Sequence, residues 1–383
     1  MNAHPSQRAR LAALACAAAS CLAACAVAPE AARPAATAAT AATADREPAN
    51  VIDLSRLMTP GINIGNTMEA LPNETAWGNP APSQALMDAY RAAGFRSVRI
   101  PLSWRPYEDA QHHIDPKWMA HVKDVVDEAR RANLYVMINT HWDGGWMNHP
   151  SRDHQAAIEA QLNAYWTQIA TAFKDYDEHL LFAGSNEVGL ENTVAPPTPE
   201  QAAVQNSFNQ TFVDAVRATG GRNATRYLVV QSFTTNIDSA VNFAKIPRDT
   251  AAGRLLMEVH YYDPYNFTIN GDSKVWQWGK RATDRSASDP WADEPWVDKQ
   301  FGSMKSHFVD HGVGVIVGEY GAYAKPDHPG ARSYVDDWAR YVTHAIASNG
   351  LVPMWWDTGA LIDRATGAPK QPELIKAIVD AAR

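Results

Sequence analysis

The sequence predicts a (β/α)8 barrel, in which eight parallel strands alternate with helices. Eight short apolar runs, separated by stretches of helical spacing, lie within residues 51–383. The runs are apolar at consecutive positions, which is typical of parallel strands covered on both faces. Polar and aromatic residues follow these runs, as expected where the carboxyl ends of barrel strands form one functional rim. An open, doubly wound sheet is the structural alternative, but it usually has fewer strands.

The predicted strands lie at residues 61–64, 97–101, 135–139, 180–183, 227–231, 255–259, 313–317 and 351–355. Apolar residues at helical spacing predict helices at 83–93, 116–132, 155–174, 201–218, 296–310, 332–348 and 373–382. A long polar insertion occupies residues 266–291. Because loops of this length in compact domains are often functional, we interpret the insertion as a wall of a cleft.

The first 50 residues differ from the rest of the chain. Residues 1–25 contain two arginines followed by an uncharged Ala/Leu-rich run, which is the pattern of an export signal. Residues 22–25 resemble a bacterial lipobox, so we expect lipidation of Cys25; an ordinary signal peptidase site at 26–28 is the alternative. Residues 26–50 are rich in Ala, Thr and Pro and predict a flexible linker. We expect an exported protein, either secreted or attached to the bacterial outer membrane through this lipid alone.

Composition argues against several classes of protein. A net charge of −8 disfavours a nucleic-acid partner, and the chain has no Gly-rich phosphate loop. All 3 cysteines lie in the first 25 residues, so the predicted domain has neither a disulfide nor a thiol nucleophile. The 13 tryptophans and 13 tyrosines are numerous, and a surplus of aromatic side chains at strand ends suits stacking against sugar rings.

Two predicted strands lead into glutamates. The run at 180–183 is followed by Asn186 and Glu187, and the run at 313–317 by Glu319. Two carboxyl groups facing each other across a cleft are the minimum for cleaving a glycosidic bond. We predict Glu187 as the general acid, with Asn186 beside it to hold a sugar hydroxyl, and Glu319 as the nucleophile.

Further polar side chains are predicted at the same rim. Arg99 would keep a carboxylate in its charged form, and Tyr262 could donate to the same oxygen. His141 and His260 would shape the hydrogen-bond network. A buried Glu–Arg pair with satisfied core histidines is the alternative for any one of these residues, and the agreement among strand ends favours a site.

The sequence resembles the family 5 glycoside hydrolases, in particular the bacterial endoglucanases and the related endo-mannanases. The matching segments span the domain in order, at residues 61–69, 98–101, 186–187, 259–264, 318–321 and 355–357. The resemblance implies retaining hydrolysis of a β-linked polysaccharide or oligosaccharide, with Glu187 as acid/base, Glu319 as nucleophile, and no metal or organic cofactor. The residues that match the family's remaining active-site positions are Arg99, His141, Asn186, His260, Tyr262 and Trp356.

Two positions depart from the family pattern. The family often has His-His where this chain has His141 and Trp142, and commonly a proline where Val188 follows the acid. Neither departure touches the two glutamates, so they bear on substrate preference rather than on hydrolysis. Trp142 is interpreted either as a sugar-stacking face or as a wedge under the third loop.

Hydrolysis of cellulose-type β-1,4-glucan is the favoured function. Asn66 and Glu69 match positions that relatives with mixed glucan and mannan activity use near distal subsites, so endo-mannanase and xyloglucanase are alternatives. The candidates for sugar stacking are Trp77, Trp104, Trp142, Trp146, Trp276, Trp278 and Trp356.

Two other classes compete with this function. A non-catalytic glycan-binding barrel would lack one of the two glutamates, and a barrel metallohydrolase would need a His-x-His pair or its equivalent. A monomer is expected.

Overall fold

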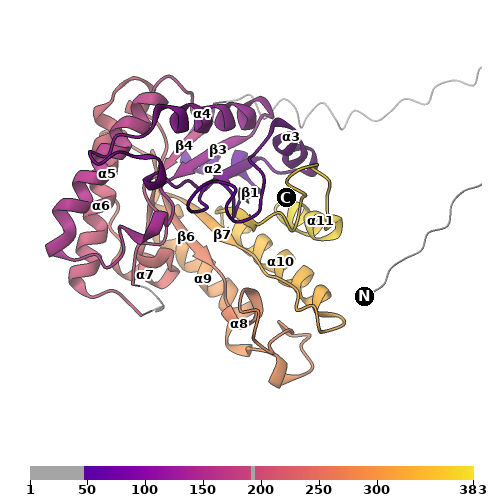
Figure 1. The fold of residues 1–383 in the computed structure, drawn as a ribbon. Coiled ribbons are helices and arrows are strands. Elements are labelled where there is room, and N and C mark those ends of the chain that lie inside the picture. Colours follow the sequence, from indigo (N-terminus) through magenta and orange to yellow (C-terminus); the bar gives the residue numbers. More distant parts are fainter. Residues whose placement is uncertain (1–46, 191–194) are drawn as a thin grey trace, which may run out of the picture. The chain divides into compact units, whose positions relative to one another are not determined.

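The computed structural model of the chain describes residues 47–190 and 195–383, in which eight strands form a closed parallel barrel. The strands are β1 (Gly61–Ile64), β2 (Ser97–Ile100), β3 (Tyr135–Asn139), β4 (Leu180–Ala183), β5 (Leu228–Gln231), β6 (Leu255–Tyr261), β7 (Gly314–Tyr320) and β8 (Val352–Asp357). They pair in chain order, and β1 closes the barrel by pairing with β8 (Figure 1). The predicted (β/α)8 fold is confirmed, and an open sheet is ruled out.

Helices surround the barrel (Figure 1). They are α2 (Val51–Met58), α3 (Gln84–Ala93), α4 (Pro116–Arg131), α5 (Arg152–Ala172), α6 (Pro199–Ala218), α7 (Ile237–Phe243), α8 (Tyr265–Thr268), α9 (Glu294–His307), α10 (Ala331–Ser348) and α11 (Pro372–Ala381). Short 3-10 helices lie at Arg105–Tyr107, Asp143–Gly145, Gly221–Ala224, Phe233–Thr235, Arg285–Ala287, Pro290–Ala292 and Val309–His311. The predicted helices are present with ends shifted by a few residues, whereas α2, α7 and α8 are too short for their periodicity to be recognised.

Local sequence signals place the helix ends. The Ser83 side chain accepts a hydrogen bond from the backbone at the start of α3, and Gly94 ends that helix in a left-handed conformation with φ +108°. At the start of α6, Thr198 and Gln201 form a reciprocal capping box. These signals determine the residues at which α3 begins and ends and at which α6 begins.

The buried apolar side chains form two clusters. The larger combines outward-facing strand residues with the inner faces of the surrounding helices. The smaller lies inside the barrel and includes Met137, Leu181, Val229, Leu256, Ile316 and Met354. Val51, Leu54 and Met58 of α2 belong to this inner cluster, and Ser97 at the start of β2 donates to the Met58 carbonyl at 2.6 Å. Helix α2 therefore covers the amino-terminal end of the barrel and leaves the carboxyl rim for chemistry.

Strands β6, β7 and β8 run further toward the rim than the sequence predicts. His260 consequently lies within β6 and Glu319 within β7, rather than after those strands. The register of the β6–β7 pairing shifts between Val259 and His260, and His260 then lies opposite Glu319. Such irregularities re-aim side chains next to active sites.

The segment after β6 contains α8 and extends away from the barrel beside α10 (Figure 1). Arg281 Nη2 donates to Ser333 Oγ at 2.8 Å, and the Tyr334 hydroxyl donates to the Arg281 carbonyl at 3.4 Å. These contacts fix the insertion against α10. Among the residues that the structure describes, no helix combines the length and apolar character needed to cross a bilayer.

Candidate active site

Polar side chains from several strands converge at the carboxyl rim of the barrel. The predicted site residues that hydrogen bonds and ion pairs link there are Arg99 in β2, Asn186 and Glu187 after β4, His260 in β6, Tyr262 after β6 and Glu319 in β7. His141 after β3 and Trp356 in β8 form a parallel ring pair. The predicted juxtaposition of Glu187 and Glu319 is present.

Glu187 and Glu319 lie close to each other and to His260. One carboxylate oxygen of each glutamate and one ring nitrogen of His260 all lie within 4.8 Å of one another. His260 Nδ1 is 2.7 Å from Glu187 Oε1 and 3.7 Å from Glu319 Oε2. The Glu187 side chain is 48% exposed, whereas that of Glu319 is 8% exposed. One carboxyl group is thus open to solvent and the other is embedded in the barrel mouth.

Arg99 is fully buried and connects several of these groups. Its Nη1 donates to Glu319 Oε1 at 2.8 Å and to Asn63 Oδ1 at 3.0 Å, and its Nη2 donates to Asn186 Oδ1 at 2.6 Å. Because Asn186 accepts this bond through its oxygen, its amide nitrogen is the group that it can offer to a ligand. A charge-assisted bond from an immobile guanidinium holds the Glu319 carboxylate in one orientation.

Three polar residues of the site were not predicted. Asn63 in β1 donates to the Gly318 carbonyl at 2.8 Å while accepting from Arg99, so it joins β1 to β7 and β2. Glu258 in β6 is fully buried, and its Oε1 lies 3.0 Å from Arg99 Nε. Gln231 at the end of β5 donates to Glu258 Oε2 at 2.7 Å. Asn63 and Glu258 stand inside apolar runs and Gln231 ends one. The available signal was that a single polar residue in such a run must find a buried partner.

The charges of the site shift its pKa values in specific directions. Burial alone would lower the pKa of His260, but Glu319, Glu187 and Glu258 together raise it to about 9. Desolvation opposes ionisation of Glu187, yet His260 and Arg99 more than offset it and lower its pKa. At Glu319, burial together with repulsion from Glu187 and Glu258 raises the pKa despite the same two cations. The two glutamates therefore compete for one set of positive charges and titrate as a unit.

Tyr262, His141 and Trp356 complete the rim around the pair. The Tyr262 hydroxyl donates to Glu319 Oε2 at 3.2 Å, and burial keeps its pKa well above the usual value, so the hydroxyl stays protonated. The His141 ring is parallel to the Trp356 ring, with centroids 5.9 Å apart and an interplanar angle of 8°. Burial, with Arg99 and His260 nearby, holds the pKa of His141 well below its usual range, so this imidazole is neutral.

Asn66 and Glu69 form the turn that follows β1. Asn66 adopts a left-handed conformation with φ +57°. Glu69 is only 2% exposed, and its carboxylate accepts bonds from the backbone nitrogens of Asn66 and, at 2.9 Å, Thr67. Burial raises the pKa of Glu69 to about 7. The Glu69 carboxylate thus accepts backbone hydrogen bonds within the turn and fixes its conformation.

The predicted sugar-stacking tryptophans differ in how far their rings are exposed. Trp77 and Trp142 are 46% and 48% exposed, while Trp146, Trp276 and Trp356 are partly buried. Trp104 and Trp278 are buried in the core, and their indole nitrogens donate to backbone carbonyls of Asn139 and Ala292. The prediction that these two stack on sugars is wrong, because sequence position at a strand end or in a loop does not reveal on which side a ring packs.

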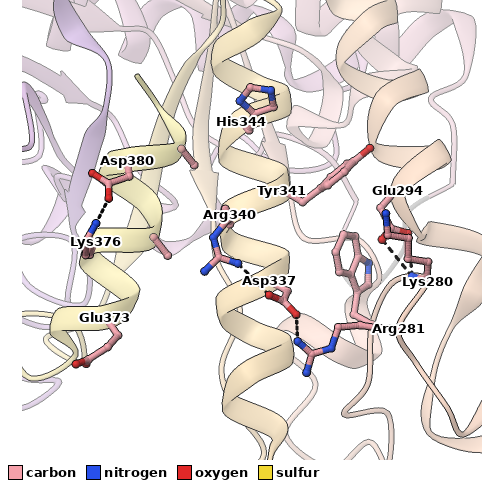
Figure 2. A pocket seen from close by; sticks show the side chains of 13 residues that line it. Lys280, Arg281, Glu294, Asp337, Arg340, Tyr341, His344, Glu373, Lys376 and Asp380 are labelled. Carbon is pink, nitrogen blue, oxygen red and sulfur yellow. Dashed lines mark hydrogen bonds and ion pairs between the residues drawn. The ribbon is translucent and has the colours of Figure 1, made fainter.

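A separate groove lies on the outer wall of the barrel, between α10, α11 and the insertion (Figure 2). Several of its charged residues pair with one another: Asp337 bonds both Arg281 and Arg340, and Lys376 bonds Asp380. Among the described residues, the groove shares none with the rim that holds Glu187 and Glu319. The chemistry suggested by the sequence belongs to the rim.

The predicted export signal and Cys25 lie outside the described residues. The described chain begins at residue 47, shortly before Asn50 caps α2. The linker predicted at 26–50 is therefore described only in its last few residues.

Comparison with protein families gives one extended match. The model of the cellulase family, glycosyl hydrolase family 5, matches residues 62–361. This segment runs from the second residue of β1 to beyond β8 and contains every residue of the rim described above.

Similar proteins are β-glucan hydrolases by name. A xyloglucan-specific endo-β-1,4-glucanase of Bacteroides ovatus is 42% identical over 353 residues, covering 86% of this chain and 69% of that protein. Endoglucanase A of Paenibacillus barcinonensis is 34% identical over 366 residues, covering 88% of this chain and 91% of that protein.

Solved structures agree with these sequence relatives. A Bacteroides ovatus xyloglucanase in complex with a XXXG heptasaccharide superposes with a TM-score of 0.84 at 40% identity, over 88% of this chain and 77% of that chain. A broad-specificity endoglucanase from Bacteroides salanitronis gives 0.81 at 35% identity, over 88% of this chain and 97% of that chain.

Proposed function

The chain belongs to glycoside hydrolase family 5, and from that premise we propose that it is a retaining endo-β-1,4-glucanase with Glu187 as acid/base and Glu319 as nucleophile. The observation that carries the proposal is the separation of the two carboxylates, which have oxygens within 4.8 Å of each other. Retaining glycosidases hold these carboxyl groups about 5–5.5 Å apart, whereas inverting enzymes need roughly 6.5–9.5 Å to admit a water molecule. The close approach supports double displacement.

In the first step, Glu319 attacks the anomeric carbon of the sugar that occupies the rim. The bond from that carbon to the glycosidic oxygen breaks, and Glu187 transfers its proton to the departing oxygen. The products are a glycosyl ester on Glu319 and a free chain with a new hydroxyl. Arg99 and Tyr262 hold the two Glu319 oxygens at 2.8 and 3.2 Å, which fixes the attacking group before the sugar arrives.

In the second step, water replaces the departed chain. Glu187 is now a carboxylate and takes a proton from this water as its oxygen attacks the anomeric carbon. The ester bond to Glu319 breaks, and the sugar leaves with its original anomeric configuration. The exposure of Glu187 suits both steps, because its carboxyl group must reach a leaving group and then a water molecule.

The reaction needs the proton on Glu187, whereas in the free protein the cations favour ionised Glu187 and burial favours protonated Glu319. A bound sugar chain would cover the exposed Glu187 side chain and remove water from it, which raises a carboxyl pKa. Glu319 would keep its bonds from Arg99 and Tyr262. Substrate binding thus moves the shared proton to the carboxyl group that must donate it.

Cellulose-type β-1,4-glucan and xyloglucan are the two main candidate substrates. Cellulose-type β-1,4-glucan is favoured by the endoglucanase relatives, and xyloglucan by the Bacteroides ovatus enzyme whose name specifies it. Both polymers share a β-1,4-glucan backbone, so the same catalytic pair serves either one. Endo-mannanase activity is a third candidate, raised by Asn66 and Glu69 in the sequence.

The test is hydrolysis of carboxymethyl-cellulose, xyloglucan and β-mannan side by side, with the anomer of the first product followed by NMR. We expect cleavage within the two glucan polymers and the β-anomer as the initial product. A kcat/KM on xyloglucan at least about tenfold above that on carboxymethyl-cellulose, a difference of about 1.4 kcal/mol, would assign xyloglucan as substrate. Initial release of the α-anomer would refute the retaining mechanism.

A non-catalytic glycan-binding barrel is the competing class. It would bind these polymers without cleaving them, and wild type and Glu319→Gln would then behave alike in the same assay. The ion pair from Arg99 to Glu319 supports catalysis, since a site for binding alone has no need of an oriented carboxylate beside a second one.

We also propose that Cys25 is acylated after signal cleavage and tethers the domain to the bacterial outer membrane. In the full-length chain, Cys25→Ala should move the protein from the membrane to the soluble fraction. Full membrane retention of this variant would contradict a lipid anchor at Cys25.

A further inference from the structure

A third carboxylate lies directly beneath the catalytic pair. Glu258 is in β6, two residues before His260, and its side chain is fully buried inside the barrel mouth. It is too deep to touch a sugar. Burying an ion costs several kcal/mol unless it is paired and hydrogen-bonded, so a buried Glu258 needs partners that compensate its charge.

Glu258 contacts both cations of the site. Its Oε1 lies 3.0 Å from Arg99 Nε and 3.3 Å from His260 Nε2. Gln231 Nε2 donates to the other oxygen at 2.7 Å. Burial opposes its ionisation, but Arg99, His260 and Gln231 more than compensate and lower its pKa, so Glu258 is ionised.

The backbone next to Glu319 is shaped to admit this carboxylate. A Cβ atom added to Gly318 would stand 2.0 Å from Glu258 Oε1, so any larger residue at this position would displace Glu258 or the strand. The residue beside the nucleophile therefore leaves the room in which the third carboxylate sits.

The formal charges of this cluster indicate how many protons the catalytic pair holds. With all groups ionised, the three carboxylates Glu187, Glu319 and Glu258 face the two cations Arg99 and His260. One proton on the catalytic pair makes the cluster neutral. A singly protonated pair is the state that double displacement requires, with one acid and one nucleophile.

We infer that Glu258 is a positioning residue that holds Arg99 and His260 under the catalytic pair and, through its negative charge, keeps one proton on that pair. This inference rests on the proposed function. It assigns to Glu258 a role in setting the pH range of catalysis rather than a contact with substrate.

Other titratable groups around the cluster do not change this count near pH 6. Tyr262 is held protonated and His141 neutral by burial. Glu69, which interacts with Glu319 through charge, has a pKa raised to about 7 by burial and is largely protonated there. Glu258 thus supplies the additional negative charge.

The test is the pH dependence of kcat/KM for Glu258→Gln on a soluble β-glucan. Removing a negative charge makes every proton in the cluster easier to lose. The alkaline limb, which reports loss of the single proton that the catalytic pair holds in the free enzyme, should therefore move to lower pH by about one unit, as expected for removal of a nearby like charge. A purely structural role would lower activity or stability without moving this limb.

Three further variants sharpen the test. Glu258→Asp keeps the negative charge but moves it away from Arg99 and His260. It should therefore shift the alkaline limb to lower pH by less than Glu258→Gln does. This variant also provides the test if Glu258→Gln does not fold. The exchange variant Gln231→Glu/Glu258→Gln restores the charge count and should return the limb toward wild type. Asp143→Asn is the matched control, because Asp143 is a buried carboxyl of the same rim that bonds the backbone of Trp104 and Arg105 and not the catalytic pair. The alkaline limb of the kcat/KM profile of Asp143→Asn should stay at the wild-type pH.

The outcomes separate this inference from the proposed function. If Glu319→Gln and Glu187→Gln are inactive on polysaccharide while Glu258→Gln and Glu258→Asp keep the wild-type limb, the catalytic assignment stands and the role of Glu258 is refuted. If Glu319→Gln retains normal activity, the proposed function itself fails. A limb shifted in Glu258→Gln and restored in the exchange variant supports the inference.

Discussion

His260 Nδ1 lies 2.7 Å from Glu187 Oε1, and the histidine is almost fully buried while the glutamate is half exposed. The contact ties the solvent-facing carboxyl group to the charge network inside the barrel mouth. Because three carboxylates raise the pKa of His260 to about 9, the imidazolium is present throughout the neutral range. The protonation of Glu187, the proposed acid/base, thus depends on charges held within the fold.

The first prediction concerns stability against pH. The folded pKa of His260 is above its ordinary value of 6.5, so its contribution to stability is complete below pH 6.5 and is lost as pH rises through about 9. The shift corresponds to a contribution on the order of 3 kcal/mol. Thermal unfolding at pH 6.5 and pH 9.5 should show a clear decrease in Tm for wild type. His260→Gln should lack the part of this Tm decrease that comes from His260. An equal decrease in Tm in both proteins would contradict the predicted contribution of His260.

The second prediction is that Glu319→Gln abolishes turnover of a folded protein. The amide is not nucleophilic, and it replaces a carboxylate held by Arg99 and Tyr262. Loss of a covalent nucleophile should lower kcat by roughly 10³-fold or more. Initial rates on carboxymethyl-cellulose measure this, and circular dichroism checks the fold. Activity within tenfold of wild type would show that Glu319 is not the nucleophile.

The sequence predicted the barrel because its strands are short and apolar at consecutive positions. The runs at 61–64, 135–139 and 180–183 match β1, β3 and β4 in the structure. The carboxyl ends of β6 and β7 were placed too early, because His260 and Glu319 interrupt the apolar pattern although the chain continues as strand. Polar residues at a functional rim break the periodicity on which such predictions depend.

The supporting residues of the site were harder to foresee. Glu258 and Asn63 lie inside apolar runs, and nothing in their spacing says that each bonds Arg99. The first contact crosses the closed barrel from β6 to β2, and the second depends on the β1–β2 register, which places Asn63 opposite Arg99. The burial of Trp104 and Trp278 was likewise decided by tertiary packing.

The third prediction separates the two glutamates. Glu187→Gln cannot protonate a leaving group, so hydrolysis of polysaccharide should fall by roughly 10²–10⁴-fold. A dinitrophenyl β-cellobioside needs little protonation, so formation of the glycosyl ester from it should be nearly normal. Stopped-flow release of dinitrophenol should therefore show a burst followed by slow turnover, because the second step lacks its base. Equal losses on both substrates at this first step would argue that Glu187 is not the acid.

The fourth prediction concerns the Trp356 ring as a sugar platform. Trp356 is parallel to His141, and a Cβ added to Gly65 would stand 2.8 Å from the indole. Trp356→Ala should lower kcat/KM on β-glucan by about tenfold or more, equivalent to at least about 1.4 kcal/mol. Gly65→Ala should also weaken binding, because the added methyl group displaces the same ring.

Trp142→Ala provides the comparison for this platform, since its ring is 48% exposed and belongs to the same rim. If Trp142 stacks on sugar, its loss should raise KM while kcat stays near wild type, because a ring that contacts only the bound sugar chain contributes to binding equally in the ground and transition states. Trp356 pairs in register with Asn63, which accepts a hydrogen bond from Arg99, so we expect its ring to contact the reacting sugar and its loss to lower kcat as well. Kinetics on soluble β-glucan for Trp142→Ala, Trp356→Ala and Gly65→Ala measure both parameters. A Trp356→Ala enzyme with unchanged kcat and KM would show that the ring serves only to pack the rim.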